Sequence, residues 1–177
     1  MTSVAAAGDP PADGDPTEAT STARGGAAGV LVVGYGNVLR GDDGLGPRIV
    51  ELLAQDPRFA RATLVPAHQL APELALDMSA ASLVIFVDAR TGDVPGAVSA
   101  RHVDPAGAGG SASSHHLEPA DLVALALELY GAAPAAFAVS VGAAALDVGD
   151  RLSPAVERAL PDAVEAIARI VAGHDDA

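Results

Sequence analysis

Residues 29–46 read GVLVVGYGNVLRGDDGLG, and this stretch indicates how the chain folds. The run up to Gly34 is apolar, rich in valine and closed by glycine, which is typical of a buried strand. After the glycine-rich loop, Asp42 or Asp43 is expected to cap a helix whose apolar residues repeat at helical spacing: Leu45, Ile49, Leu52 and Leu53. A strand followed by a loop and a helix is the unit from which parallel sheets are built.

The rest of the chain continues this alternation. Further strands are predicted at 62–65, 83–87, 97–103 and 136–141, and further helices at 71–78, 119–131 and from Pro154 onward, where Pro161 is expected to introduce a kink. We therefore expect a three-layer α/β/α fold, with a mostly parallel twisted sheet of about five strands and helices on both faces. The predicted organisation is a disordered acidic extension rich in Ala, Gly and Pro (1–28), one α/β domain (29–172) and a C-terminal tail (173–177).

Composition excludes several classes of function. The 177 residues include no cysteine, and all ten basic residues are arginine, so a Walker-type phosphate loop, a Schiff-base lysine, thiolate metal sites and a cysteine nucleophile are absent. A formal net charge of -13 opposes binding to nucleic acid. No apolar run approaches the roughly 20 residues that span a bilayer, and the N-terminus lacks the features of a secretory signal. We expect a cytoplasmic protein without membrane insertion.

Polar residues follow the predicted strands at the edge where open α/β sheets bind ligands. Asp43 lies in the first loop, Asp88 ends the most apolar strand, and His115 and His116 follow a stretch rich in Gly, Ser and Ala. Two neighbouring carboxylates disfavour mutual ionisation unless a cation or an imidazolium lies between them. A set of two Asp and one His suits Zn, Ni or Mn and leaves coordination positions for a substrate.

Each of these residues also has a purely structural interpretation. An Asp at a helix start is commonly a cap, an Asp after a strand is commonly a turn residue, and a histidine in a loop is commonly solvated. The first loop begins like a dinucleotide-binding motif, but Leu39 replaces its third glycine, and the paired carboxylates would repel a pyrophosphate. Ser140 lacks the preceding glycine of a nucleophile elbow, so a strand position is the better interpretation.

The first loop resembles the signature of the hydrogenase maturation proteases, in the run Gly34-x-Gly36-Asn37-x-Leu39-x-x-Asp42-Asp43-Gly44-x-Gly46. The resemblance continues in order through 83–88, 113–117, 120–122, 152–154 and the final helix, so it covers essentially all of 29–172. It implies an endopeptidase, of the aspartic or metal-dependent type, that removes a C-terminal extension from the large-subunit precursor of a nickel–iron hydrogenase.

The resemblance also implies a site. Asp43, Asp88 and His115 would be the catalytic, metal-binding residues, and the metal would be nickel carried by the substrate precursor rather than held permanently. The candidate residues of the substrate cleft are Asn37, Asp42, His68 and His116. We expect the precursor as partner, no nucleic acid, and a monomer.

Two other functions fit the same residues. One is a non-catalytic maturation factor that binds the nickel-loaded precursor, and the other is a hydrolase that acts on a small substrate with its own bound metal. The loop at 66–74 departs from the pattern of some family members.

Overall fold

The computed structural model describes residues 29–106 and 117–175. The predicted disorder of 1–28 therefore lies outside the described residues, as do His115, His116 and residues 176–177. The described chain forms these elements in order: β1 (Gly29–Tyr35), the 3-10 turn η1 (Gly41–Gly44), α1 (Leu45–Leu53), the 3-10 turn η2 (Pro57–Phe59), β2 (Thr63–Ala67), α2 (Leu74–Ser79), β3 (Ala81–Arg90), β4 (Val98–His102), α3 (Pro119–Tyr130), β5 (Ala135–Gly142) and α4 (Pro154–Asp175).

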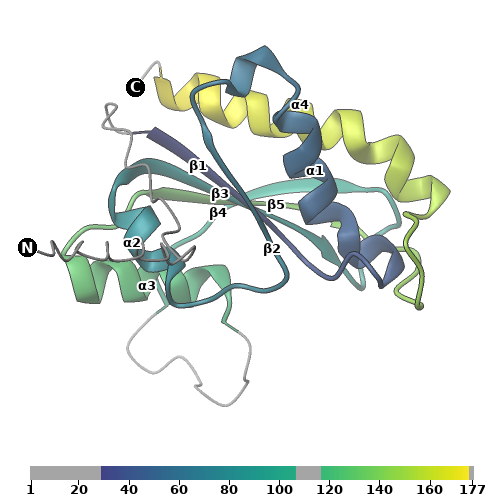
Figure 1. The fold of residues 1–177 in the computed structure, drawn as a ribbon, viewed down its shortest axis with the longest axis horizontal. Helices are drawn as coiled ribbons and strands as arrows, with labels where there is room; N and C mark the ends of the chain where they lie inside the picture. The colour runs from purple at the N-terminus through teal and green to yellow at the C-terminus, as the bar shows by residue number, and fades with distance from the viewer. Residues whose placement is uncertain (1–28, 107–116, 176–177) are drawn as a thin grey trace, which may run out of the picture.

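The strands form one mixed sheet in the order β2-β1-β3-β5-β4. The first four strands in this order are parallel, and β4 runs antiparallel to β5 at one edge. Helices α1 and α4 pack on one face of the sheet, while α2 and α3 pack on the other (Figure 1). The structure thus confirms the predicted mostly parallel α/β fold with helices on both faces.

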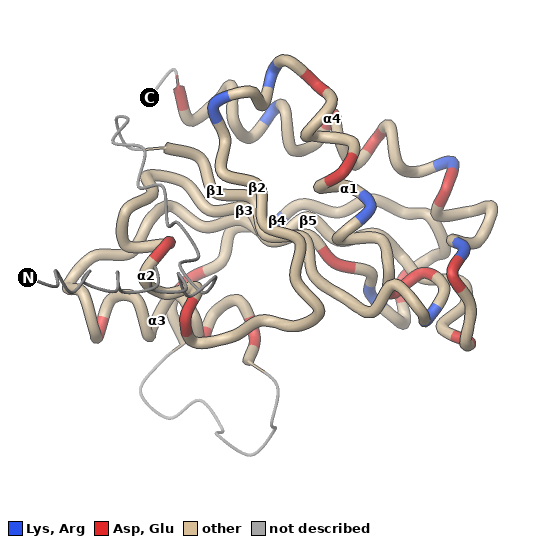
Figure 2. The backbone as a smooth tube through the Cα atoms, viewed as in Figure 1, with Lys and Arg blue, Asp and Glu red and all other residues tan. Residues whose placement is uncertain are grey.

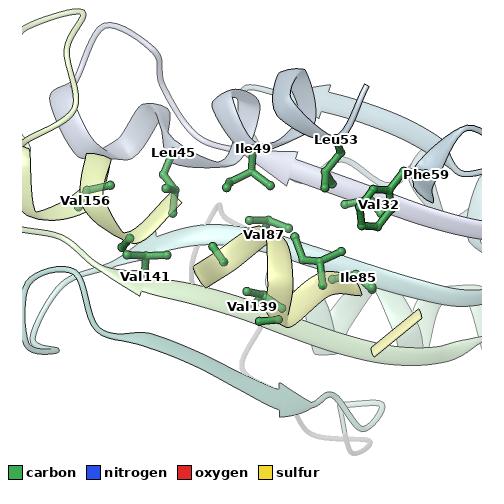
Figure 3. Close-up of a cluster of buried hydrophobic side chains, with 14 of the residues drawn as sticks. Val32, Leu45, Ile49, Leu53, Phe59, Ile85, Val87, Val139, Val141 and Val156 are labelled. Atoms are coloured by element: carbon green, nitrogen blue, oxygen red, sulfur yellow. The ribbon is translucent and has the colours of Figure 1, made fainter. Parts of the chain in front are cut away.

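Two apolar clusters hold the layers together. On one face, α1 contributes Leu45, Ile49 and Leu53, which point toward the valine and isoleucine side chains of β3 and β5 (Figure 3). On the opposite face, apolar residues of α2 and α3, such as Met78 and Leu122, pack on the other side of the same strands. Both faces of the central strands are therefore buried, which explains why these strands read as continuous apolar runs.

Two glycines bring α1 directly onto the sheet. A Cβ atom added to Gly34 would lie 2.1 Å from the carbonyl oxygen of Gly46, and one added to Gly46 would lie 2.4 Å from the backbone nitrogen of Tyr35. Any side chain at either position would therefore push the helix away from the strand. This close contact fixes the loop between β1 and α1 above the carboxyl end of the sheet.

The local structure differs from the sequence prediction at the start of α1. Residues 41–44 form a 3-10 turn, α1 begins at Leu45, and no side chain caps it, so the expected cap by Asp42 or Asp43 is wrong. The physical reason is that both carboxylates accept hydrogen bonds from other backbone groups, which are described below.

The last helix begins with the predicted N-cap and ends later in the chain than predicted. The hydroxyl of Ser153 accepts a hydrogen bond from the backbone N–H of Val156, as expected of an N-cap. Helix α4 then runs past Pro161 to Asp175, three residues into the segment expected as a C-terminal tail. Within 29–106 and 117–175, no helix is both long enough and apolar enough to cross a membrane.

Charge is distributed unevenly between the two helical layers. Figure 2 shows acidic and basic residues mixed along α1 and α4, whereas α2 and α3 carry acidic residues only. The acidic residues of α2 and α3 are Asp77, Asp121 and Glu128. The helices of the α2–α3 face therefore carry acidic charge with no basic residue of their own to balance it.

Candidate active site

A pocket of about 340 Å³ lies at the carboxyl ends of β1 and β3. This is the edge at which open α/β sheets bind ligands. The pocket is lined by the glycine loop, by the segment after β2, by the end of β3 and by the chain that leads into α3: Tyr35, Gly36, Asn37, Arg40, Asp43, His68, Gln69, Leu70, Asp88, Leu117 and Glu118. The structure therefore brings Asp43, Asp88, Asn37 and His68 together, as the sequence suggested.

Asp43 is held by the loop that precedes it. Its Oδ2 accepts the backbone N–H of Asn37 at 3.0 Å, and the Asn37 side chain in turn accepts the backbone N–H of Leu39 at 2.9 Å. Gly36 makes this fold of the loop feasible, because its φ is 137° and a Cβ there would lie 1.9 Å from the carbonyl oxygen of Asp43. The loop thus fixes one carboxylate at the wall of the pocket.

Asp88 is held by hydroxyl groups from the strands on either side of β3. Ser140, in β5, donates a hydrogen bond to Oδ1 at 2.5 Å, and Tyr35, at the end of β1, donates one to Oδ2 at 3.2 Å. Both oxygens of the carboxylate are therefore engaged, which fixes its orientation.

Sequence reasoning assigned no role at the site to Tyr35 or Ser140. Ser140 is a strand residue, as expected, and is 3% exposed, but its hydroxyl reaches Asp88 because the two residues are direct register partners. These two contacts follow from the strand order, which places β1 and β5 on either side of β3. The sequence alone does not give that order.

The environment of Tyr35 disfavours its ionised form. Burial raises the pKa of Tyr35 well above its usual value of 10.0, and the negative charge and hydrogen bond of Asp88 raise it further. The phenol is therefore protonated at neutral pH, where it is a hydrogen-bond donor to Asp88.

This protonation can be tested by alkaline titration. The chain has two tyrosines, and we expect the folded wild type and a Tyr35→Phe variant to show the same absorbance increase at 295 nm on going to pH 11. After unfolding in guanidinium chloride, the wild type should gain the signal of one additional phenolate, since an exposed tyrosine titrates near pH 10. A smaller increase in the folded variant than in the folded wild type would contradict the assignment.

Asp42 does not belong to the pocket, which corrects the expectation that it is a cleft residue. Its side chain is fully buried. Its carboxylate accepts backbone N–H groups from Ala144 (2.8 Å), Ala145 (2.9 Å) and Ser153 (2.6 Å). Successive residues of a tight helical turn point in different directions, so one Asp faces the pocket and the other faces the 143–153 loop.

The hydrogen bonds of Asp42 determine its ionisation. Burial by itself would raise the pKa of Asp42, but the backbone N–H groups of Ser153, Ala145 and Ala144 outweigh it and hold the pKa below its usual value of 3.8. Asp42 is therefore an anion with a structural function, since it joins the first loop of the chain to the segment that begins α4.

The histidine part of the predicted site lies outside the described residues. His115 and His116 fall in 107–116, while Leu117 and Glu118, which follow them directly, line the pocket. In the part of the chain that the structure describes, no three His, Asp or Glu side chains gather closely enough to hold a metal ion. The described part of the proposed set consists of the two carboxylates, Asp43 and Asp88.

Comparison with known proteins gives the family. The family model of the hydrogenase maturation proteases matches residues 47–170, which is well over half of the chain, so the chain belongs to the hydrogenase maturation protease family. Asp88 lies within the matched segment, and Asp43 lies four residues before it. A search among curated proteins gives no match.

Solved structures with the same fold agree with this assignment. The hydrogenase maturating endopeptidase HybD from E. coli is 29% identical, with a TM-score of 0.65 over 78% of this chain and 89% of that one. A hydrogenase 2 maturation peptidase from a Thaumarchaeota archaeon is 27% identical, with a TM-score of 0.59 over 81% and 97%. The maturation protease HycI from Thermococcus kodakarensis, at 22% identity, shares the fold with a TM-score of 0.63 over 81% and 92%.

Proposed function

We propose that this protein is an endopeptidase that removes the C-terminal extension of a nickel-loaded hydrogenase large-subunit precursor. Membership of the hydrogenase maturation protease family supports the reaction class and the hydrogenase substrate. The single observation that supports the site is that two acidic side chains from separate elements, Asp43 and Asp88, line one pocket at the carboxyl edge of the sheet.

The pocket has the chemistry to recognise a metal that arrives with the substrate. Carboxylate oxygens are ligands for divalent first-row metals, and the proposed third ligand, His115, would add the imidazole nitrogen that suits nickel. In this proposal the nickel is bound to the precursor, and the protease recognises it as part of the substrate. A metal so placed can polarise the scissile carbonyl or activate a water molecule. Asn37 and His68 would line the path of the peptide.

Among the described residues, a covalent mechanism through a serine finds no support in the pocket. Cysteine is absent from the chain, and Ser140, which contacts one of the two carboxylates, is buried and donates its hydroxyl proton toward Asp88. An activated serine needs a base that removes its proton and an approach for the substrate carbonyl. Ser140 instead orients the carboxylate.

The proposal is tested on purified precursor that carries its C-terminal extension, in nickel-loaded and nickel-free forms. We expect mass spectrometry to show loss of the C-terminal peptide only from the nickel-loaded form after incubation with this protein. A nickel-loaded precursor that stays intact but binds would make the protein a non-catalytic maturation factor. Cleavage of both forms at equal rates would refute recognition through nickel. Stoichiometric metal in the isolated protein would instead favour a hydrolase with its own metal.

A further inference from the structure

Three large apolar side chains stand exposed beside the active-site pocket. Val38 is 54% exposed, Leu39 is 63% exposed and Val148 is 95% exposed. We call these three residues the apolar rim. A solvent-exposed valine or leucine does not stabilise the folded chain. Exposed apolar side chains that cluster commonly mark a surface that binds another molecule.

The backbone holds the rim together although its residues come from distant parts of the chain. Arg40 and Gly149 form a parallel bridge, so the residues that precede them, Leu39 and Val148, are neighbours across it. The backbone N–H of Gly149 bonds to the carbonyl of Leu39 at 3.0 Å, and that of Gly41 bonds to the carbonyl of Gly149 at 2.9 Å. The rim is therefore preorganised, and preorganised groups lose less entropy on binding.

The rim adjoins the pocket along the chain, although its three residues are not part of the pocket lining. Asn37 and Arg40 line the pocket, and the two residues between them, Val38 and Leu39, belong to the rim. On its other side Val38 borders a second hollow of about 440 Å³, whose apolar lining is Pro47, Leu152 and Leu160. A protein whose C-terminal segment enters the pocket from the side of the glycine loop would therefore lie against the rim.

We propose that the apolar rim is the docking surface for the body of the hydrogenase large-subunit precursor, which it holds while the C-terminal segment lies in the pocket. This inference rests on the proposed function and extends it to the contact that provides affinity. A protein fits the rim because the side chains project from the surface, whereas a small ligand needs a concave site. A net charge of -13 opposes an anionic membrane surface.

The test is a double variant, Leu39→Asp with Val148→Asp, assayed with nickel-loaded precursor. We expect KM for the precursor, and the Kd measured by surface plasmon resonance, to rise at least about tenfold, as for loss of interface anchors, while kcat changes less than twofold. The control is Leu129→Asp, because Leu129 is 59% exposed on the last turn of α3 and lines no described pocket. The control should match the wild type, and all variants should keep the wild-type thermal midpoint.

The outcomes separate the rim from the reaction. Unchanged KM and Kd in the double variant would overturn the rim as a docking surface, even if the wild type cleaves. A wild type that binds the precursor without cleaving it would refute the proposed reaction, while a weaker Kd in the double variant would still support the rim. If the double substitution alters sedimentation of the free protein or its binding to phosphatidylserine vesicles, and not Kd for the precursor, the rim serves self-association or a membrane instead.

Discussion

Processing of the nickel-loaded precursor should fall at least about a hundredfold in an Asp88→Asn variant and in an Asp43→Asn variant. Loss of one group that stabilises charge in a transition state commonly costs a factor of this size in kcat. Asparagine has nearly the same shape as aspartate, so the loss isolates the negative charge. The measurement is the rate at which the C-terminal peptide appears, followed by mass spectrometry at saturating precursor. His115→Gln should give a loss in the same direction if His115 completes the proposed site.

Both asparagine variants should remain folded, because an amide can keep the hydrogen bonds of the carboxylate that it replaces. An amide oxygen at position 43 can still accept the backbone N–H of Asn37, and an amide at position 88 can both accept from and donate to the hydroxyls of Tyr35 and Ser140. The matched control is Asp77→Asn, an exposed carboxylate on α2 that does not line the pocket. Wild-type rates for the Asp43 and Asp88 variants would remove both residues from the catalytic assignment.

The neighbouring carboxylate should give the opposite result. We expect Asp42→Ala to lower the free energy of unfolding by about 3–5 kcal/mol, because it leaves three backbone N–H groups without their acceptor. For a chain of this size the thermal midpoint should drop by roughly 10 °C or more. The two consecutive aspartates would then have different roles, since we expect Asp43→Asn to affect the reaction and Asp42→Ala to affect the stability of the fold. A thermal midpoint of Asp42→Ala within a few degrees of the wild type would show that the 143–153 loop does not depend on this anion.

The contribution of Asp42 should also depend on pH in a defined direction. Because its pKa is lower in the folded than in the unfolded chain, the stabilisation is complete above the usual value of 3.8 and is lost as the pH falls through the lower folded value. The difference in unfolding free energy between the wild type and Asp42→Asn should therefore be constant between about pH 7 and 5 and shrink below about pH 4. Urea titrations at several pH values would measure it, and a difference that grows in acid would contradict the assignment.

The fold was predictable because its elements carry local signals. The apolar runs at β1, β3 and β5 indicate strands buried on both faces, and Ser153, Pro154 and Gly131 mark helix ends through capping chemistry. Strand β2 was predicted to end before Pro66, yet it includes it, since an edge strand tolerates the missing N–H. The end of a strand that depends on pairing with a neighbouring strand cannot be predicted from the sequence of that strand alone.

The site was predictable only in part. Asp43 and Asp88 follow strands, and strand ends of a parallel sheet meet at one edge, so their common pocket could be predicted. That Asp43 lines the pocket while Asp42 binds the 143–153 loop could not be predicted. This difference depends on where that loop lies, and the loop is about a hundred residues further along the chain. Tyr35 and Ser140 escaped notice for the same reason, since only the strand order places their hydroxyls on Asp88.

The hydrogen bonds around Asp88 also have a consequence during synthesis of the chain. Tyr35 precedes Asp88 by 53 residues, and Ser140 follows it by 52. A ribosome therefore completes β3 well before β5 exists, and during that interval the carboxylate has at most one of its two hydroxyl partners. The fully oriented pocket can arise only after β5 has left the exit tunnel and paired with β3. The architecture thus delays the full orientation of the Asp88 carboxylate until translation of the domain is nearly complete.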